Sequence, residues 1–167
     1  MKKFVLLFAA LLVAGCGEVV VDGDQIQFRG GIIEQDGLAY FEGEPFTGVA
    51  VWKYTAPNPN GQKWNEITYK DGNQHGLETY WYENGQKQSE HTFKEHKEHG
   101  PGAAWYESGQ KAGEWNFNDG RKDGRETYWH ENGQKKSEGI YKDGEEISAK
   151  YWNSKGEEVD TLKEAQK

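Results

Sequence analysis

The sequence predicts an all-β protein whose fold is an elongated antiparallel sheet of tandem β-hairpin repeats, with about 24 residues per repeat. Three observations lead to this prediction. Aromatic residues make up 14% of the 167 residues, whereas much of the aliphatic content lies near the N-terminus. The chain has 22 glycines, which favours many tight turns between short strands. A turn motif also recurs at a fixed spacing of 24 residues.

The recurring motif is Asn-Gly-Gln-Lys, with Ser in place of Asn in one copy. It occupies residues 60–63, 84–87, 108–111 and 132–135. The third residue after each lysine is a glutamate, and an aromatic ring follows three positions later, as in Glu90 and Phe93. Because these positions coincide in four copies, they indicate one repeated structural unit.

Each unit is predicted to be one hairpin, because Asn-Gly between two aromatic runs is typical of a type I′ turn with positive φ at both central residues. In the second copy, strands are expected over 77–82 and 87–93, joined by a turn over 83–86. A second, longer turn then runs through Gly100. Most copies have Asp-Gly in this second turn, whereas residues 94–97 lack a glycine, so this turn is expected to be the least regular.

Alternation along a strand places Trp81 on one face and Tyr80 on the other. The tryptophan position recurs in later copies and predicts a tryptophan ladder. If Phe93 packs with Trp81, the recurring glutamates lie on the more polar face. The opposite face is expected to carry an uneven aromatic strip, which is the candidate partner-binding surface: Tyr80, Tyr82, Tyr106, Tyr128 and His130.

The whole pattern, Gly followed by Trp-Tyr-x-Asn-Gly-Gln-Lys-x-x-Glu-x-x-Tyr-Lys-Asp-Gly, resembles the MORN repeat variant. This family is found in bacterial lipoproteins and in antitoxins of toxin–antitoxin pairs. The resemblance covers residues 36–158, with degenerate copies at both ends. It implies an elongated antiparallel sheet and interaction roles, and it implies no catalytic residues.

Residues 1–15 are predicted to be a lipoprotein signal peptide. Lys2 and Lys3 precede an apolar run that is shorter than the roughly 20 residues needed to span a bilayer. Residues 13–16 resemble the bacterial lipobox, which implies acylation of Cys16 and cleavage before it. An ordinary secretory signal with an incidental cysteine is the alternative. Gly17 resembles the sorting pattern that, in diderm bacteria, sends lipoproteins to the outer membrane, where they face the periplasm.

The expected organisation after cleavage has three parts. Residues 16–35 form the lipidated N-terminus and a capping hairpin with an Asp-Gly turn, residues 36–158 form the repeat array, and residues 159–167 form a tail of helix-forming composition. Residues 55–59 lengthen one loop and break the period. Long loops often carry function, although a neutral insertion is the more ordinary interpretation.

No pattern of residues indicates a catalytic site, a cofactor or a metal, so we expect a protein that is not an enzyme. His96 and His99 share a turn with glutamates, but equivalent residues in neighbouring repeats stand roughly 10 Å apart, too far for one ion. The repeated glutamates have similar environments, whereas a catalytic carboxylate pair needs different ones.

The acidic composition limits the partners. The net charge is −8, and loss of Lys2 and Lys3 makes it −8 − 2 = −10, which argues against nucleic-acid binding. We expect attachment to the membrane through the lipid anchor and binding of an unknown protein. Neutralisation of a partner in the manner of an antitoxin or immunity protein, and carbohydrate or peptidoglycan binding through the tyrosine strip, are the alternatives. Gly102 and Ala104 replace a glutamate and a tyrosine, so the third repeat is expected to be flatter and to mark a docking point.

Overall fold

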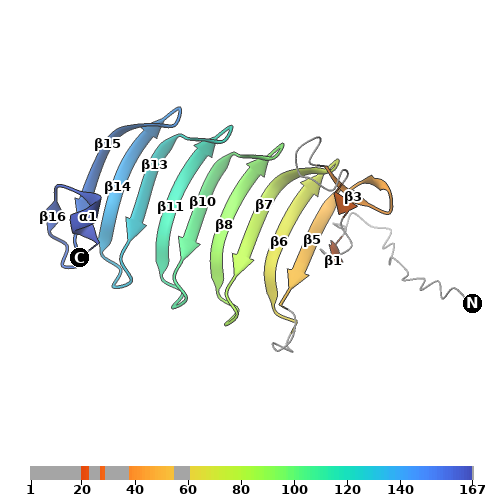
Figure 1. Cartoon of the computed structure of the whole chain (residues 1–167), viewed down its shortest axis with the longest axis horizontal. Helices are drawn as coiled ribbons and strands as arrows, with labels where there is room; N and C mark the ends of the chain where they lie inside the picture. The colour runs from red at the N-terminus through yellow and green to blue at the C-terminus, as the bar shows by residue number, and fades with distance from the viewer. Residues whose placement is uncertain (1–19, 23–26, 29–37, 55–60, 167) are drawn as a thin grey trace, which may run out of the picture.

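The computed structural model describes residues 20–22, 27–28, 38–54 and 61–166. Figure 1 shows a long curved sheet of hairpins with a small sheet near its N-terminal end. The described elements are β1 (Val20–Asp22), β2 (Gln27–Phe28), β3 (Ala39–Phe41), β4 (Glu44–Pro45), β5 (Gly48–Lys53), β6 (Lys63–Lys70), β7 (Asn73–Trp81), β8 (Lys87–Lys94), β9 (Lys97–Glu98), β10 (Gly100–Trp105), β11 (Lys111–Asn118), β12 (Arg121–Lys122), β13 (Gly124–Trp129), β14 (Lys135–Lys142), β15 (Glu145–Trp152), β16 (Glu158–Val159) and α1 (Leu162–Ala165).

The predicted fold class is confirmed. Within the described residues the main sheet has 13 strands, in the order β1-β5-β6-β7-β8-β10-β11-β13-β14-β15-β16, with β9 and β12 attached to β8 and β11. From β5 onward, consecutive strands pair in antiparallel fashion, so the array is a continuous meander of hairpins. The described part of the chain contains no helix that is long and apolar enough to cross a membrane.

The N-terminal strands differ from the predicted capping hairpin. Strand β1 pairs in parallel with β5, with Val20 opposite Val49, whereas β2 pairs with β3 in the small sheet β2-β3-β4. The two strands belong to different sheets, so a hairpin between them is wrong for the described residues. The small sheet instead helps to cover the first repeat, where the buried apolar cluster contains Val21, Ala39, Phe46, Ala50 and Tyr69.

The Asp-Gly turns are the tight two-residue turns, which is the reverse of the prediction. Asp71 and Gly72 have φ values of 49° and 80°, and Lys70 pairs directly with Asn73. Positive φ at both central residues defines the type I′ turn. The Asn-Gly turn is longer. Gly85 alone has positive φ there, and its N–H donates to the carbonyl of Tyr82, three residues earlier, over 2.9 Å. This geometry is that of another common hairpin connection, a type I turn followed by a glycine in the left-handed conformation.

The turn without glycine is as regular as the others, so the expectation of irregularity at residues 94–97 is wrong. Glu95 and His96 have φ values of 49° and 63°, close to those of the Asp-Gly turns. The neighbouring hairpin holds this conformation, because the His96 N–H donates to the Gln74 carbonyl over 3.0 Å. Gly120 makes the equivalent bond to Glu98. A contact between hairpins therefore overrides the local preference of the turn.

Glycines a few residues after each type I′ turn mark β-bulges. Ile67 pairs with Glu78, but two residues further on Tyr69 pairs with Gln74, so β7 carries extra residues around Gly76. Gly76 has a φ of 104°, and Gly100 and Gly124 repeat it at 100° and 105°. Bulges bend and twist a sheet, which accounts for curvature repeated once per hairpin (Figure 1).

The C-terminal tail caps the array. Strand β16 pairs with the end of β15, and the short helix α1 follows it. The Thr161 hydroxyl accepts a hydrogen bond from the Glu164 N–H at 3.3 Å, which is a typical N-cap. Ala165 is fully buried. The tail therefore covers the last hairpin in the place where a further repeat would otherwise pack.

The type I′ turn at residues 95–96 generates a stability prediction. His96→Gly should raise the free energy of unfolding by on the order of 1 kcal/mol, because glycine adopts positive φ without the cost of a Cβ atom. The measurement is urea unfolding followed by tryptophan fluorescence. Gly120→His, at the same position of the next turn, is the matched control and should lose a similar amount. Equal stability of His96→Gly and the parent chain would contradict the strain argument.

Candidate functional site

The two faces of the main sheet have different chemistry. One face, here called the ion-paired face, carries a repeated lysine, glutamate and tryptophan. In the second hairpin the Lys87 ammonium lies 2.6 Å from the Glu90 carboxylate and 5.3 Å from the ring centre of Trp105 in the next hairpin. The same arrangement recurs for Lys63, Glu66 and Trp81, for Lys111, Glu114 and Trp129, and for Lys135, Glu138 and Trp152.

This arrangement corrects the expected pairing of Phe93 with Trp81. Phe93 lies opposite Gly76 and shares its face with Tyr80, while Glu90 lies opposite Thr79 on the tryptophan side. The glutamate row therefore belongs to the tryptophan face. The ladder is stabilised by cation–π contacts, which at exposed sites contribute roughly 0.5–1 kcal/mol each.

The opposite face, here called the aromatic face, carries half-buried rings in two clusters within the described residues. Trp64 lies 6.5 Å from Trp52 and 6.2 Å from Tyr80, measured between ring centres. In the second cluster, Trp115 lies 5.4 Å from His91 and 6.2 Å from Tyr128. Trp52 also packs against the buried cluster of the first repeat. Over the hairpins that carry the second cluster, the described part of the chain forms a single layer.

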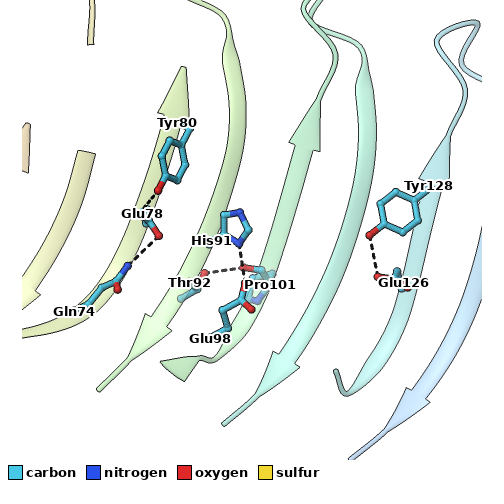
Figure 2. A network of polar contacts seen from close by, with 9 residues as sticks. All are labelled: Gln74, Glu78, Tyr80, His91, Thr92, Glu98, Pro101, Glu126 and Tyr128. Atoms are coloured by element: carbon cyan, nitrogen blue, oxygen red, sulfur yellow. Dashed lines mark hydrogen bonds and ion pairs between the residues drawn. The ribbon is translucent and has the colours of Figure 1, made fainter. Parts of the chain in front are cut away.

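Each cluster ends in a tyrosine that binds a buried glutamate (Figure 2). The Tyr80 hydroxyl donates to Glu78 Oε1 at 2.7 Å, and Gln74 Nε2 donates to the other carboxylate oxygen at 3.0 Å. The Tyr128 hydroxyl donates to Glu126 at 3.0 Å. Glu78 and Glu126 are 9% and 7% exposed. These carboxylates therefore lie beneath the rings, and most of their surface is hidden from water.

The tyrosines are held in the protonated form. Burial, followed by the hydrogen bond and the negative charge of Glu78, raises the pKa of Tyr80 from 10.0 to about 12. Burial and then the charge of Glu126 raise the pKa of Tyr128 to about 12 as well. A phenol beside a carboxylate must keep its proton to donate the hydrogen bond, so both pairs are intact at neutral pH.

The third repeat replaces the glutamate and tyrosine with Gly102 and Ala104, and Trp115 fills the freed space. A Cβ atom on Gly102 would collide with the indole nitrogen of Trp115. His91 packs on the same indole and places its Nδ1 2.8 Å from Glu98 Oε1 (Figure 2). The aromatic face is therefore filled at this repeat, and is not empty there as the small residues suggest.

A shallow hollow does lie on the ion-paired face of the third repeat. Its volume is about 330 Å³, and Leu77, Pro101, Ala103 and Arg125 are among the residues that line it. Its lining also includes Glu90, Glu114 and Lys111, which are engaged in the ladder. The hollow thus arises because Pro101 and Ala103 are small or rigid where other hairpins carry larger side chains.

The five residues of the predicted strip have two different positions. Tyr80 and Tyr128 lie on the aromatic face beside the glutamates. The other three tie each hairpin to the next, because their side chains donate to the carbonyl of the tryptophan in the following repeat: Tyr82 to Trp105 at 2.9 Å, Tyr106 to Trp129 at 2.6 Å and His130 to Trp152 at 2.9 Å. Their polar atoms are therefore used in holding the array together.

Four members of the two clusters, Trp52, Trp64, His91 and Trp115, are missing from the predicted strip. Trp64 reaches this face because the register shifts between Trp52 and Lys53, so a bulge turns it to the side of Asn65. Trp115 had a signal in the sequence: the one repeat that gains this tryptophan is also the one that has Gly102. Paired departures from a repeat consensus can thus reveal a compensating contact.

The remaining predicted features either make a contact within the sheet, as His99 does, or lie outside the described residues. His99 contacts Asp119 at 3.3 Å. Among the described residues, no group of three or more His, Cys, Asp and Glu side chains is arranged to hold a metal ion. Cys16, the signal segment and the insertion at residues 55–59 lie outside the described residues.

The geometry defines a tandem-repeat module that offers an extended sheet face. Residues 74–95 and 122–143 match the family model of the MORN repeat variant. Each matched segment begins at the second residue of a strand, β7 or β12, and contains one complete Asn-Gly hairpin turn. These two segments are therefore similar to repeats of the MORN repeat variant. It has no significant match among curated proteins.

The tyrosine–glutamate pairs generate a prediction about alkaline pH. The folded-state pKa of Tyr80, about 12, lies above its ordinary value of 10.0, so its contribution to stability is fully present below pH 10 and is lost as the pH rises through 12. Glu78→Gln removes the negative charge and should bring the pKa of Tyr80 closer to 10. Carbon-13 NMR of the tyrosine Cζ atoms measures this shift. Glu107→Gln, at an exposed position, is the control and should leave Tyr80 unchanged; an unchanged pKa in Glu78→Gln would contradict the argument.

Proposed function

We propose that this chain is a lipid-anchored, non-catalytic scaffold that binds a protein partner through its aromatic face. The observation that carries the proposal is the difference between the faces. The ion-paired face uses its lysines and glutamates in contacts with one another and with tryptophans. The aromatic face leaves clustered rings partly exposed, with Trp64 the most exposed at 37%, and clustered apolar surface of this kind is typical of interaction sites.

The rigidity of the array supports a binding role. Each hairpin is fastened to the next at both ends, by a tyrosine or histidine side chain at one end and by a turn N–H at the other, as in Tyr106 to Trp129 and Gly120 to Glu98. A preformed surface loses less conformational entropy when a partner binds. The contacts that stack the repeats thus also prepare the face for recognition.

The absence of catalysis is part of the proposal. The polar groups on the aromatic face are engaged as structural pairs, as Tyr80 is with Glu78 and His91 is with Glu98. These pairs hold rings in place. Repetition also gives the ladder glutamates similar surroundings, whereas acid–base catalysis needs two groups with different pKa values.

Binding of a protein is favoured over binding of a glycan by the tilt of the rings. Neighbouring rings in the two clusters are inclined by 33° to 52°. A flat sugar chain stacks best on rings that lie in one plane, whereas side chains of a protein interdigitate with tilted rings. Neutralisation of a toxic partner is a narrower form of the same proposal, and identification of the partner decides it.

The anchor rests on the N-terminal sequence. Residues 1–15 have the charge and apolar run of a signal peptide, and residues 13–16 resemble a lipobox. Acyl chains on Cys16 would hold the acidic array close to a membrane without any need for a basic surface. In a diderm bacterium this would place the array on the periplasmic side of the outer membrane.

Site-specific photocrosslinking tests the binding face. A benzoyl-phenylalanine at position 64 and, separately, at position 115 should capture the same partner from intact cells. Trp64 has a matched control in Ile140, which is equally exposed at 37% but lies on the other face. We expect at least a fivefold higher yield from positions 64 and 115 than from position 140.

The experiment separates the two faces directly. Equal capture from positions 64 and 140, or capture only from position 140, would refute the assignment of the binding face. Capture from neither face, in cells that produce the folded protein, would refute the scaffold role.

Lipid anchoring has its own test. Cys16→Ser should abolish incorporation of labelled palmitate and move the protein from the membrane fraction to the soluble fraction, because the thiol is the expected site of acylation. The parent chain, labelled in parallel, is the control. Retention of the variant in the membrane fraction without label would show that another feature attaches the protein.

A further inference from the structure

Two positions on the aromatic face are copies of one another, two repeats apart. Glu78 and Tyr80 in the first copy correspond to Glu126 and Tyr128 in the second, and both glutamates are buried beneath the tyrosine that bonds them. Among the positions at which the copies differ, one supplies a side chain that bonds the glutamate in both copies. Gln74 occupies it in the first copy and Lys122 in the second.

In the second copy the structure holds a primary ammonium group. Lys122 Nζ lies 2.5 Å from Glu126 Oε1 and 4.8 Å from the ring centre of Tyr141. The Lys122 side chain is 35% exposed although the Glu126 side chain is only 9% exposed. The Lys122 side chain therefore extends from the surface and places its ammonium group against the buried carboxylate of Glu126.

In the first copy the same carboxylate has no cation. Glu78 accepts hydrogen bonds from Tyr80 and from the neutral amide of Gln74, and the ion pairs among the described residues do not include it. The first copy also has an aromatic ring at the position of Tyr141, because Phe93 lies opposite Gly76 as Tyr141 lies opposite Gly124. A buried charge that lacks an opposite charge is costly, so Glu78 gains from an external cation.

The neighbouring histidine does not supply that charge. His91 is the cross-strand neighbour of Glu78, but its Nδ1 points to Glu98 (Figure 2). The His91 ring packs on Trp115. Lys122 belongs to the second copy, two repeats away. Strand β6 places Ile67 opposite Glu78, and Tyr69 opposite Gln74 is close enough for the charge of Glu78 to help raise the pKa of Tyr69. Within the described residues, the polar groups bonded to Glu78 are thus the hydroxyl of Tyr80 and the amide of Gln74, and neither is a cation.

We infer that Glu78, Tyr80 and Phe93 form a binding site for the primary ammonium group of a lysine side chain on the protein partner. The ammonium takes the place that the Gln74 amide holds in the free protein, as the Lys122 ammonium does in the second copy. A hydrogen bond from a neutral donor is thereby replaced by a hydrogen-bonded ion pair, which gives the buried carboxylate an opposite charge. The inference rests on the proposed function, because the site belongs to the aromatic face, and it gives that face one chemical requirement.

The test uses the full mature chain in nonionic detergent and the probe Nα-acetyl-lysine N-methylamide. Binding is followed through the NMR signals of Tyr80 and Tyr128. The parent protein should bind one probe molecule, with shifts centred on Tyr80. The norleucine analogue of the probe, which has no ammonium, should bind at least tenfold more weakly.

A reciprocal pair of variants exploits the two copies. Gln74→Lys supplies an internal ammonium to Glu78 and should weaken probe binding at least tenfold. Lys122→Gln removes the internal ammonium group from the second copy and should create a second binding site for the probe, seen as new probe-induced shifts of the Tyr128 signals. Each variant carries the residue that the other copy already tolerates at that position, so both should fold, and the melting temperature checks this.

The outcomes are decisive in both directions. Probe shifts that are absent, or that Gln74→Lys leaves unchanged, overturn the ammonium site, and so does Lys122→Gln without a gain at Tyr128. If one variant fails to fold, the other still decides. The photocrosslinking yield from position 64 does not depend on the probe, so loss of the ammonium site leaves the protein-binding proposal standing, and loss of face-specific crosslinking leaves the ammonium site standing.

Discussion

The whole molecule depends on the fact that a single-layer sheet can bury its side chains only against the neighbouring hairpin. No second layer lies over the repeats from β7 to β14 in the described structure, so contacts between hairpins must supply the order that a core gives elsewhere. They do so along the full strand length: the Tyr82 hydroxyl bonds the Trp105 carbonyl at one end, and the His96 N–H bonds the Gln74 carbonyl at the other. Lysine stems and tryptophan rings cover the surface between them.

The same constraint gives the two faces different contacts. Repeated lysines, glutamates and tryptophans form a closed set of contacts on the ion-paired face, so that face is largely occupied with stabilising the array. The aromatic face carries the departures from repetition, because Gly102, Ala104 and Trp115 change together there. Repetition thus builds the scaffold, and the loss of repetition gives one face its individual shape and charge.

Charge is used differently at equivalent positions of the aromatic face. One slot carries Gln74, Glu98 and Lys122 in successive repeats, each bonded to a different partner: Glu78, His91 and Glu126. A uniform array would give every repeat the same affinity for the same group. Variation at this slot instead gives neighbouring repeats different charges and different contacts on the same face.

The sequence by itself determined the fold class, the length of the repeat and the positions of both turns, because alternation and turn chemistry act over a few residues. It did not determine the turn types, the face of the glutamate row or the role of Tyr82, Tyr106 and His130. Those features depend on register shifts, such as the bulge that redirects Trp64, and on bonds between residues 22 or 23 positions apart. Only the stacked hairpins bring such residues together, so the tertiary structure decided which side chains hold the array together and which form the aromatic face.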